Sequence, residues 1–573
     1  MSIQNIEISA MLTQLADLLE IEGENPFRIR AYRNAARLVE TLPRNVAAMI
    51  AAGEELSKLP GIGEALATKI KEMVSTGHLQ ALEKEEHRVP PTLSDLLKIP
   101  GLGPKRVHLI YEQLNIHTLA DLSKAVDAGK LRALPGFGEK TETMVRQYLQ
   151  NRNPGAQRVL RATVEQLVSP LLDRLKKAPG VKQITVAGSY RRQMETLGDV
   201  DLLVAAEDSD EVTRLFVEHD DVAKVLARGK TKSSVTLRSG LQVDLRVVPE
   251  LSYGAALHYF TGSKAHNIAI RTRGVQAGLK INEYGVFRGT ERVGGRTEAE
   301  VFKAVGLPFI EPELRENQGE IEAAEKGLLP RLVNLPDIRG DLHSHTPATD
   351  GRNDLQTLAQ AAREKGFEYL AITDHSKRMT LVHGLNATRL ARQVRDIDKL
   401  NAAFNGFRLL KSIEVDILED GSLDLSDDIL DELDLVVAAI HSRFTLTRDK
   451  QTERLIRAMD NPRVTILAHP TGRLINERKP MDLDLERLLK AAQERGCFVE
   501  LDSQPTRLDL TDAACRMAHD LGVKVSLSTD AHSAVELDFM RHGIAQARRG
   551  WLTAADVINT RTWKDLQRLI KRK

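Results

Sequence analysis

Residues 188–192, Gly-Ser-Tyr-Arg-Arg, and residues 198–201, Gly-Asp-Val-Asp, decide the fold of the middle of this chain. Asp199 and Asp201 are two positions apart in an apolar run, and on a β-strand this spacing places both carboxylates on one face, about 7 Å apart. A third carboxylate, Asp244, lies in a later run that also has the pattern of a strand. Three carboxylates on adjacent strands can hold two Mg²⁺ or Mn²⁺ ions about 3.5–4 Å apart, the separation used for in-line displacement at phosphorus.

The turn at Gly188 and Ser189 strengthens this interpretation, because its backbone N–H groups and its hydroxyl are suited to a phosphate. The turn and the carboxylates together predict a nucleotidyl-transfer site. The alternative is that Asp199 and Asp201 are solvent-facing strand residues, which is the usual environment of aspartate. We favour the metal site because the turn precedes the pair and Asp244 follows it.

The composition is that of an ordinary globular protein, with 42% hydrophobic and 28% charged residues. A length of 573 residues exceeds a single core and predicts three to five domains. No apolar run approaches the ~20 residues of a membrane span, and the N-terminus lacks the basic-then-apolar pattern of a signal peptide. The cysteines are Cys497 and Cys515 only, so we expect no disulfide framework and a cytoplasmic location.

Charge and aromatic content limit how this chain can bind nucleic acid. The formal net charge is +1, so binding has to come from local basic patches rather than from a global field. Aromatic residues make up 4% of the chain, which argues against recognition by extended base stacking.

Three near-copies of one pattern, an aliphatic residue followed by Pro-Gly-hydrophobic-Gly, punctuate the first 150 residues, which otherwise have helical periodicity. Their glycine pairs are Gly61 and Gly63, Gly101 and Gly103, and Gly136 and Gly138. In each copy the turn ends one helix and the second glycine opens another, so that N–H groups and the positive helix end form a site for a phosphate oxygen. A single copy could equally be a helix hairpin that only packs. Three copies upstream of a nucleotidyl-transfer site favour contacts to the DNA backbone that are independent of base sequence.

A further signal is the run 259–264, Tyr-Phe-Thr-Gly-Ser-Lys, which precedes a helical stretch containing Asn267 and Arg271. An aromatic pair before a glycine turn can lie against a sugar ring, and backbone at that place would exclude a 2′-hydroxyl. The alternative is that Tyr259 and Phe260 form a buried pair, which is the commoner environment of such residues.

Beyond residue 336, buried strands alternate with amphipathic helices, which predicts an α/β barrel. Nearly every strand is followed by potential metal ligands, in the segments 341–345, 372–375, 413–416, 439–441, 467–469 and 528–532. Because the C-terminal ends of barrel strands converge, we expect these side chains to form one centre. A mixture of imidazoles and carboxylates suits Zn²⁺, Mn²⁺ or iron better than Mg²⁺. Isolated histidines elsewhere, namely His383, His519 and His542, are interpreted as ordinary structural residues.

Residues 25–312 resemble a family X DNA polymerase of the DNA polymerase beta type. The motifs that carry the resemblance are residues 188–192, 198–201, 243–246 and 259–263, in the family's order and near its spacing. The resemblance implies that Asp199, Asp201 and Asp244 bind two catalytic metals, with Asp244 placed to activate the primer 3′-hydroxyl.

The resemblance also implies a nucleotide pocket. The positions that match those holding the triphosphate are Gly188, Ser189, Arg192 and Gly198. The positions that match the sugar pocket are Tyr259, Phe260 and Gly262, and those that match contacts to the nascent base pair and template are Asn267 and Arg271. Lys264 departs from the beta enzyme, which has an acidic residue there, so nucleotide affinity and selectivity are expected to differ.

Lyase activity in this family uses a Schiff-base lysine on the helix after the first Gly-hydrophobic-Gly turn, and Lys69 falls at that place. A Schiff base needs a neutral amine, so Lys69 would need a lowered pKa. The phosphate-binding lysine that the family has four residues earlier is Ala65 here. Lys69 is therefore either a lyase nucleophile or a simple contact to the DNA backbone.

The tail from about residue 336 resembles a PHP (polymerase and histidinol phosphatase) domain. The resemblance implies three metal positions, held by His343, His345, Glu414 and Asp530; by Glu414, His441 and His469; and by Asp350, His375 and His532. It also implies Mn²⁺-dependent 3′→5′ exonuclease activity, with AP-endonuclease or 3′-end-processing activity in the same group. Asp374, beside His375, is either a further ligand or a hydrogen-bond partner of one.

The expected fold is therefore multidomain, α+β and α/β. It comprises a helical helix-hairpin-helix N-terminal region, a nucleotidyltransferase palm with a small α/β nucleotide-binding subdomain, and a C-terminal PHP barrel of the (β/α)7 type. The expected boundaries are 1–85 for a lyase-like helical domain, 86–153 for a second helical DNA-binding domain, 154–225 for the palm, 226–312 for its continuation and the nucleotide-selection subdomain, 313–335 for a linker and 336–573 for the PHP domain.

These features together predict a DNA-directed DNA polymerase that fills short gaps in DNA repair, with a PHP exonuclease in the same chain. The expected substrates are gapped or primed DNA and dNTPs, without a membrane, for a monomer that is cytoplasmic and nucleoid-associated when bound to DNA. The expected metals are two Mg²⁺ or Mn²⁺ ions in the polymerase site and up to three Mn²⁺, Zn²⁺ or iron ions in the PHP site.

Two other functions remain open at this point. One is a template-independent nucleotidyltransferase fused to a PHP phosphatase that acts on small molecules; the three glycine turns and the Tyr259–Phe260 run favour DNA instead. The other is a DNA scaffold whose sites have decayed, which the complete set of carboxylates and barrel ligands disfavours.

Overall fold

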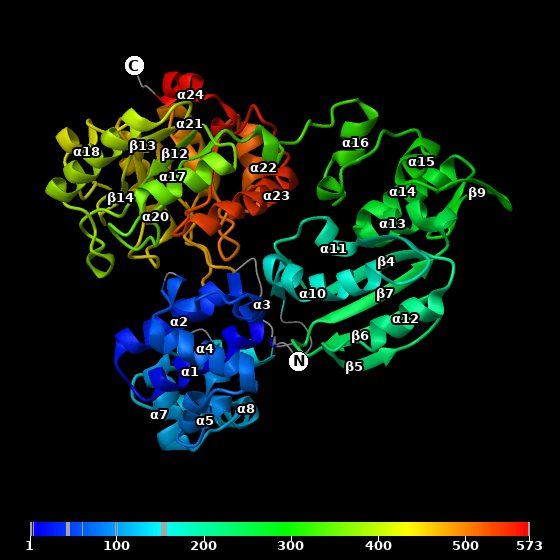
Figure 1. The fold of residues 1–573 in the computed structure, drawn as a ribbon, viewed down its shortest axis with the longest axis horizontal. Helices are drawn as coiled ribbons and strands as arrows, with labels where there is room; N and C mark the ends of the chain where they lie inside the picture. The colour runs from blue at the N-terminus through cyan, green and yellow to red at the C-terminus, as the bar shows by residue number, and fades with distance from the viewer. Residues whose placement is uncertain are drawn as a thin grey trace. The chain divides into compact units, whose positions relative to one another are not determined.

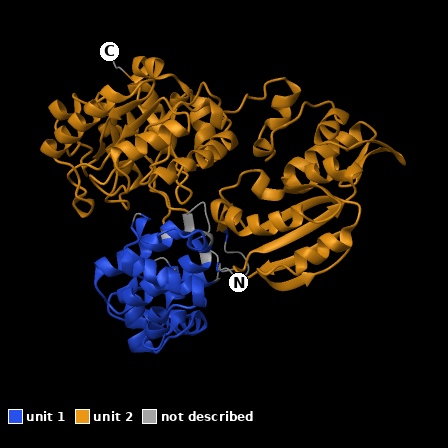
Figure 2. Cartoon of the chain, in the orientation of Figure 1, with its two compact units in different colours: residues 1–158 blue, residues 159–573 orange. Residues whose placement is uncertain are grey.

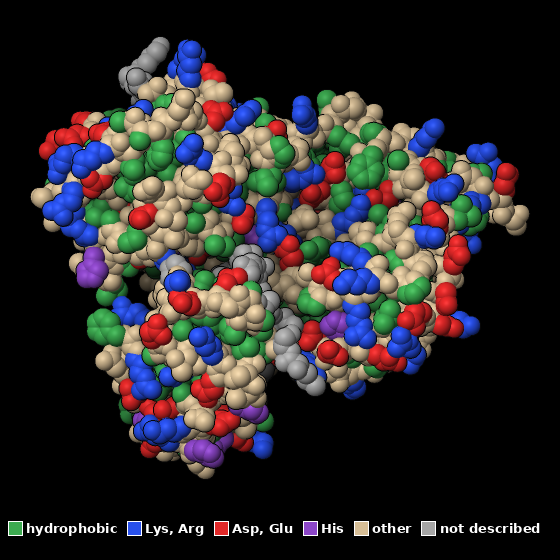
Figure 3. All heavy atoms as spheres, in the orientation of Figure 1, with side chains coloured by type: hydrophobic (Ala, Val, Ile, Leu, Met, Phe, Trp, Pro, Cys, Tyr) green, Lys and Arg blue, Asp and Glu red, His purple; other side chains and the backbone are tan. Residues whose placement is uncertain are grey.

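The computed structural model describes residues 3, 5–41, 46–59, 61–97, 99, 101–150 and 158–570. The chain divides into two compact units, residues 1–158 and residues 159–573 (Figure 2). Two prolines of the glycine turns, Pro60 and Pro100, lie outside the described residues. Among the helices that are described, none is both long enough and apolar enough to cross a membrane. On the face shown in Figure 3, basic side chains are interspersed with acidic ones, in keeping with the net charge of +1.

The first unit is helical throughout its described part (Figure 1). Its α-helices are α1 (Asn5–Ile21), α2 (Pro26–Thr41), α3 (Val46–Ala51), α4 (Glu64–Thr76), α5 (Gln80–Glu86), α6 (Ser94–Leu97), α7 (Pro104–Leu114), α8 (Leu119–Asp127) and α9 (Glu139–Gln150). Short 3-10 turns are Leu56–Lys58, Pro91–Leu93 and Leu131–Ala133. Leu12, Leu15 and Leu19 of α1 are fully buried in one hydrophobic cluster that also contains Ile70 and Met73 of α4. The helical periodicity of the sequence thus identifies the core faces of α1 and α4.

The hydrophobic residue between each pair of glycines is an anchor in this core. Ile62, Leu102 and Phe137 are all buried in the same cluster as α1. The glycines on either side of each anchor are exposed, and the first glycine of each pair has a positive φ between 78° and 82°. Burying the middle residue therefore turns the two flanking glycine backbones toward solvent.

The second unit begins with a five-stranded mixed sheet in the order β2-β4-β7-β6-β5. Its strands are β2 (Val181–Val186), β4 (Asp199–Ala206), β5 (Val222–Ala227), β6 (Lys232–Leu237) and β7 (Gln242–Val248). The pair β1 (Val159–Leu160) and β3 (Thr196–Leu197) stands apart, and the helices of this part are α10 (Arg161–Lys176), α11 (Gly188–Arg191) and α12 (Ser209–Val217). β4 and β7 are parallel, whereas the other neighbours in the sheet are antiparallel.

One face of β4 and β7 carries both a hydrophobic cluster and the predicted metal ligands. Leu203 and Ala205 of β4 pack with Val248 of β7 against α13 (Tyr253–Thr261). Because side chains of a strand alternate between faces, the odd-numbered Asp199 and Asp201 extend from this same face. Phe260, near the C-terminal end of α13, packs against this cluster on the face that carries the carboxylates.

The chain then forms a small α/β subdomain. Its elements are α14 (Lys264–Gln276), the antiparallel strands β8 (Lys280–Asn282), β9 (Gly285–Arg288) and β10 (Glu291–Gly294), and α15 (Glu298–Ala304). Beyond it lie a 3-10 turn (Pro312–Leu314) and α16 (Glu320–Glu325). Leu314 and Ile321 of this following segment are buried in the same cluster as Phe302 of α15, and Trp551 joins that cluster from near the C-terminus.

The tail is a ring of parallel strands covered by helices (Figure 1). In ring order the strands are β11 (Gly340–Asp341), β12 (Tyr369–Ile372), β13 (Arg408–Lys411) continuing as β14 (Glu414–Asp416), β15 (Val437–Ala439), β16 (Ile466–Leu467), β17 (Phe498–Asp502) and β18 (Val525–Ser528). A parallel bridge between Ser344 and Ala531 closes the ring. The helices are α17 (Leu355–Glu364), α18 (Ala387–Ala403), α19 (Asp427–Leu430), α20 (Arg448–Asp460), α21 (Leu485–Arg495), α22 (Asp512–Leu521), α23 (Met540–Arg549) and α24 (Trp563–Ile570). This is the predicted (β/α)7-type barrel.

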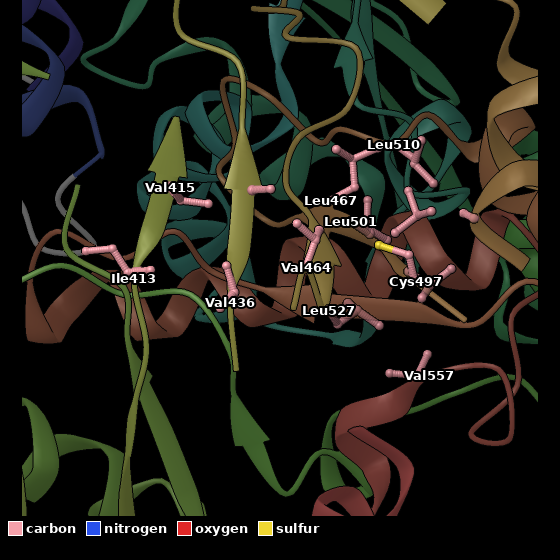
Figure 4. Close-up of a cluster of buried hydrophobic side chains, with 14 of the residues drawn as sticks. Ile413, Val415, Val436, Val464, Leu467, Cys497, Leu501, Leu510, Leu527 and Val557 are labelled. Carbon is pink, nitrogen blue, oxygen red and sulfur yellow. The ribbon is translucent and has the colours of Figure 1, made fainter. Parts of the chain in front are cut away.

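Strand alternation separates the barrel core from the barrel interior. Ile413 and Val415 pack outward into the large cluster beneath the helices, together with Leu501 and Leu527 (Figure 4). Glu414, between the first two, consequently faces inward. Strand alternation therefore directs Glu414 toward the interior of the barrel and buries its neighbours Ile413 and Val415 beneath the helices.

Candidate active sites

The polymerase-like site begins with three carboxylates on neighbouring strands. Asp199 and Asp201 lie on β4 and Asp244 lies on β7, and the parallel pairing places Asp201 directly opposite Asp244. Because directly paired residues of neighbouring strands share a face, the fold brings together all three carboxylates that the sequence identified. Asp199 is exposed, whereas Asp201 and Asp244 are half-buried.

The electrostatics of this cluster favour a bound cation. Burial raises the pKa of Asp201 to about 6, and the negative charges of Asp199 and Asp244 add to the effect. Burial alone would also raise the pKa of Asp244, but hydrogen bonds from Gln242 and Ser234 and the nearby ammonium of Lys232 lower it overall. A divalent cation relieves the repulsion among crowded carboxylates, so the donor set fits Mg²⁺ or Mn²⁺. The Nζ atom of Lys232, on β6, lies 3.3 Å from Asp244 Oδ2, a contact that no motif in the sequence indicated.

The Gly-Ser turn lies against the same carboxylates. Gly188 begins α11 with φ of +60°, and a Cβ atom at this position would lie 2.5 Å from Asp201 Oδ2. The N–H of Ala187, just before it, donates to the backbone oxygen of Asp201 at 2.8 Å. The turn is therefore fixed directly beside a metal-ligand candidate, where a triphosphate would have to lie.

The residues proposed for the nucleotide pocket gather at the end of α13. Arg192 Nη1 donates to the backbone oxygen of Thr261 at 2.6 Å, next to Gly262, whose φ is +70°. Asn267, on α14, donates from Nδ2 to the backbone oxygen of Tyr259 at 2.6 Å. Arg271 lies exposed one turn farther along α14, and on a helix residues four apart share a face.

Tyr259 and Phe260 are not a fully buried pair. Both side chains are only half-buried, and their rings meet edge to face with centroids 5.1 Å apart. The guanidinium of Arg246, on β7, lies 4.9 Å from the centre of the Phe260 ring. The pair thus retains accessible surface near the carboxylates, as a sugar-binding platform requires.

The barrel brings all nine predicted ligands together in a second site. Three overlapping groups of donor atoms lie close enough to share ions, namely His345, Asp350, His375 and His532; His343, His345 and Asp530; and His375, Glu414 and His441. His469 joins through its Nε2 atom, 3.0 Å from Glu414 Oε1.

Glu414 is the common member of the centre. Its Oε1 lies 3.2 Å from His441 Nε2, and its Oε2 lies 2.6 Å from His375 Nδ1. Oε2 also lies 3.7 Å from His343 Nε2 and 3.8 Å from His345 Nε2. A carboxylate in this position can bridge metal ions, which agrees with the double role that the resemblance implied for Glu414.

Polar atoms left without hydrogen bonds show that these residues fit metal ions. Buried atoms that form no well-oriented hydrogen bond among the described residues include His343 Nε2, both ring nitrogens of His345, His375 Nδ1 and Glu414 Oε2, although the last two lie 2.6 Å apart. A buried polar atom without a hydrogen bond destabilises the folded protein unless an ion, a water molecule or a ligand binds it. Asp350, His441 and His532 are more accessible than the rest, with 28%, 14% and 26% of their side chains exposed. Most of the candidate ligands are therefore buried, and these three remain partly accessible to a substrate.

The charges in this centre are strongly coupled. Burial alone would raise the pKa of Glu414, but His375, His441 and His343 hold that pKa well below its usual value. Burial alone would lower the pKa of His343, yet Glu500, Asp530 and Glu414 hold it well above its usual value. Positive charge is therefore stabilised among these carboxylates, and metal ions supply it more effectively than protons do.

Two carboxylates contact candidate ligands without having been given this role in the sequence interpretation: Glu500 was not singled out, and Asp416 was only part of the segment 413–416. Glu500 Oε1 lies 2.8 Å from His343 Nδ1, and Glu500 Oε2 accepts from the backbone N–H of His469 at 2.7 Å. Asp416 Oδ1 lies 3.0 Å from His441 Nδ1. The signal that could have revealed Glu500 is its spacing of two from Asp502 in an apolar strand, the same pattern that identified Asp199 and Asp201.

Asp374 and the remaining histidines have other partners. Asp374 accepts hydrogen bonds from the N–H and the hydroxyl of Thr346, at 2.9 and 2.5 Å, and so holds the loop after His345. His519 pairs with Asp556 and His542 with Arg161, each at 3.0 Å. His383 belongs to none of the groups of ligand atoms found among the described residues.

The glycine turns of the first unit form the candidate DNA interface. Gly63 and Gly103 immediately precede α4 and α7, and a Cβ atom on either of them would meet open space. Arg106 does not point freely to solvent, because its Nη1 and Nη2 donate to the backbone oxygens of Gly101 and Gly136 at 2.7 and 2.9 Å. It therefore ties the second turn to the third. Lys69 is half-exposed on α4.

Comparison with known families covers most of the chain. Matches are found to the DNA polymerase beta palm (residues 158–253), the DNA polymerase beta thumb (256–316) and the PHP domain (341–503). The N-terminal region matches a helix-hairpin-helix domain (3–79) and a SAM-like helix-hairpin-helix tandem (93–151).

Similar proteins support the same division. The chain is 37% identical to the DNA polymerase/3'-5' exonuclease PolX of Bacillus subtilis (strain 168), over 99% of both chains. It is 28% identical to DNA polymerase lambda of Arabidopsis thaliana, over 54% of this chain and 62% of that protein. A probable phosphatase of Thermoanaerobacter sp. (strain X514) is 28% identical over 41% of this chain and 95% of its own length. The chain therefore belongs to the family X DNA polymerases that carry a C-terminal PHP domain.

Proposed function

We propose that this protein extends primer 3′ ends in short DNA gaps at the β4–β7 carboxylates and removes nucleotides from 3′ ends at the barrel centre. As a DNA polymerase with 3′→5′ exonuclease activity it acts in DNA repair. The observation that carries the proposal is the presence of both constellations in one chain: Asp201 opposite Asp244 beside the Gly188 turn, and a buried nine-ligand centre around Glu414.

In the polymerase site, each residue is given a role by its position. Asp199, Asp201 and Asp244 hold two divalent cations, Mg²⁺ or Mn²⁺, which when bound lower the pKa of the attacking hydroxyl and stabilise the leaving pyrophosphate. Asp244 is the carboxylate assigned to the primer 3′-hydroxyl.

The nucleotide is held around these carboxylates. The residues assigned to the triphosphate are Gly188, Ser189, Arg192 and Gly198. Tyr259, Phe260 and Gly262 are assigned to the sugar, and Asn267 and Arg271 to the base pair and the template. The support is geometric, since Arg192 and Asn267 both hydrogen-bond to the backbone of residues 259–261 beside β4.

In the barrel, the nine ligands hold up to three Mn²⁺, Zn²⁺ or iron ions, which when bound supply a hydroxide and polarise a phosphodiester. Glu414 would be a shared ligand of these ions, and Glu500 and Asp416 would fix the rings of His343 and His441 in their binding orientation. The DNA end would approach the partly accessible ligands, Asp350, His441 and His532. AP-endonuclease or 3′-end-processing chemistry needs the same accessible phosphodiester and belongs to the same proposal.

The glycine turns bind phosphates of the DNA backbone, and this binding does not depend on the base sequence. Their support is the exposure of the three glycine pairs over buried anchors, which frees N–H groups at the starts of α4 and α7. We propose a monomer that works in the cytoplasm on DNA. A phosphatase acting on small molecules is not favoured, because the chain pairs the barrel with a complete palm and helix-hairpin-helix region.

The experiment that tests the two-site proposal uses gapped DNA labelled on the primer, with Mg²⁺ or Mn²⁺. Asp201→Ala is expected to abolish extension and to leave 3′ degradation intact, and His343→Ala is expected to do the reverse. If either substitution removed both activities from a folded protein, the assignment to two separate sites would be wrong.

Lyase activity at Lys69 stays a separate prediction, because Ala65 stands where the family has a phosphate-binding lysine. Borohydride trapping on an abasic substrate decides it. Loss of the covalent adduct in Lys69→Ala would assign Lys69 as the nucleophile, and unchanged trapping would leave Lys69 as a contact to the DNA backbone.

A further inference from the structure

Arg192 is held in place by two contacts within the polymerase part of the chain. Its Nε donates to Glu316 Oε1 at 3.0 Å, and its Nη1 donates to the backbone oxygen of Thr261 at 2.6 Å. Among the described residues no hydrogen bond involves Nη2, so this end of the guanidinium is available to an anionic ligand. Only 14% of the side chain is exposed, so these two contacts determine its conformation.

The PHP domain contributes a third constraint through Arg549, the last residue of α23. Arg549 Nη1 donates both to the backbone oxygen of Arg192, at 2.8 Å, and to Glu316 Oε1, at 3.0 Å. One carboxylate oxygen of Glu316 therefore accepts from both arginines. Asp512 Oδ2 fixes the other side of Arg549 by accepting from Nε and Nη2 at 2.9 and 2.7 Å, and 5% of the Arg549 side chain is exposed.

The same domain also holds the far end of the loop that begins at Arg192. Glu195 accepts from Arg473 Nη1 and Nη2 at 3.2 and 2.6 Å, and Gln546 Nε2 lies 3.5 Å from it. Residues 192–195 connect the Gly-Ser turn of α11 to β3, which leads directly into β4 and its carboxylates. Residues of the barrel thus form hydrogen bonds with both ends of the segment 192–195, which joins the Gly188–Ser189 turn to β3 and β4.

We infer that Arg549 is a positioning residue for dNTP binding: it acts through Glu316 and through the backbone oxygen of Arg192 to preset the guanidinium that receives the triphosphate. The inference rests on the proposed function, in which Arg192 is a triphosphate ligand. Without Arg549, the backbone oxygen of Arg192 loses its hydrogen bond from Nη1. Glu316 loses its contact to Arg549 as well, so the paired side chains of Glu316 and Arg192 can adopt other conformations together. Part of the binding energy of the nucleotide would then be used to restore the ordered geometry.

The test is single-nucleotide insertion into a one-nucleotide gap, with KM for the dNTP and kcat measured separately. Arg549→Ala is expected to raise KM about tenfold, as loss of hydrogen bonds to charged groups does, and to change kcat much less. Exonuclease activity on a single-stranded 3′ end should be unchanged. Glu316→Gln provides a second variant, and we expect it to raise KM in the same way.

Arg541→Ala is the matched control. Arg541 lies on the same helix and also forms an ion pair with the polymerase part, its Nη1 lying 2.5 Å from Glu165 Oε1. Glu165 is on α10 and does not belong to the loop 192–195. We therefore expect the KM of Arg541→Ala to equal that of the unsubstituted protein. An equal rise in both variants would overturn the inference, because it would indicate a general loosening of the interface.

Arg192→Ala separates failure of the inference from failure of the proposed function. If Arg192→Ala leaves KM unchanged, its assignment to the triphosphate is wrong. If Arg192→Ala raises KM and Arg549→Ala does not, only the positioning role of Arg549 is wrong. In the double variant we expect no rise beyond that of Arg192→Ala alone, whereas a multiplicative rise would contradict coupling between the two residues.

Discussion

Gly188 shows, at the scale of a residue, how the absence of a side chain creates a site. Its backbone has φ of +60° and lies so close to Asp201 that a Cβ atom would be 2.5 Å from the carboxylate. Gly188→Ala is expected to displace this metal ligand by a fraction of an ångström or more and to lower primer extension about a hundredfold. Exonuclease activity should persist, because neither Gly188 nor Asp201 belongs to the groups of ligand atoms found among the described residues of the barrel.

Gly180→Ala is the control for backbone strain. Gly180 has φ of +78°, but a Cβ atom there would meet nothing within 4 Å. Both substitutions therefore cost about 1 kcal/mol of conformational strain, and only one of them touches a carboxylate. Comparable extension rates for the two variants would contradict the tight placement of the turn against Asp201.

The contacts of Glu500 lead to a prediction about metal binding in the barrel. It fixes the imidazole of His343 and the backbone of His469 at once. Glu500→Gln is expected to weaken metal binding about 10- to 100-fold, so that exonuclease activity falls at limiting Mn²⁺ and recovers with excess metal. The measurement is a Mn²⁺ titration of exonuclease activity, with Glu494→Gln, a 73% exposed carboxylate on α21, as the control. An unchanged Mn²⁺ dependence would remove Glu500 from the centre.

The sequence identified the candidate ligands that the fold brings together, but the residues that contact these candidates were harder to find. His343, Glu414 and Asp530 follow strands in a recognisable pattern, since the ends of parallel barrel strands converge. Glu500 contacts His343 and Lys232 contacts Asp244, each from another strand, and such contacts depend on strand order and register. The sequence alone gives no measure of either.

At the scale of an element, each glycine turn combines a buried anchor with exposed backbone. Leu102 is 2% exposed in the core of the first unit, whereas a Cβ atom on Gly103 would meet open space. Leu102→Ala is expected to destabilise this unit by about 2–5 kcal/mol. Gly103→Ala is expected to cost less than about 1 kcal/mol but to weaken binding of gapped DNA, because a methyl group stands where a phosphate would approach.

Thermal unfolding and fluorescence anisotropy on a gapped duplex separate these two effects. Gly103→Ala should bind DNA more weakly at an almost unchanged melting temperature. If Gly103→Ala bound DNA normally, the second turn would be a packing hairpin, which is the alternative that the sequence left open for any single copy.

Elements with strong periodicity were predictable, whereas the packing of the charged segment after the small subdomain was harder to predict. The heptad-like spacing of Leu12, Leu15 and Leu19 identifies α1, because a helix of this length buries one face. The segment 313–335 is rich in charge, and that charge obscures the few apolar residues, such as Leu314 and Ile321, that are buried with Phe302.

At the scale of the whole molecule, the second unit joins the two chemistries by side-chain contacts that leave no sequence signature. Arg473 and Arg549 of the barrel bind the palm loop 192–195, although hundreds of residues separate them along the chain. Arg473 and Arg549 belong to no recognisable motif, so the sequence does not indicate that they contact the loop 192–195. The domain types were therefore predictable, and the contacts between palm and barrel required the structure.

In the proposed function, one chain adds and removes nucleotides at a 3′ end through two separate sites. The most direct test of this proposal is the conversion of labelled dNTP to dNMP on primed DNA at constant primer length. The unsubstituted protein should produce dNMP, Asp201→Ala and His343→Ala should each produce none, and a mixture of the two variants should restore the product through exchange of DNA. Release of dNMP by either variant alone would contradict the account, because nucleotide turnover would then not need both sites.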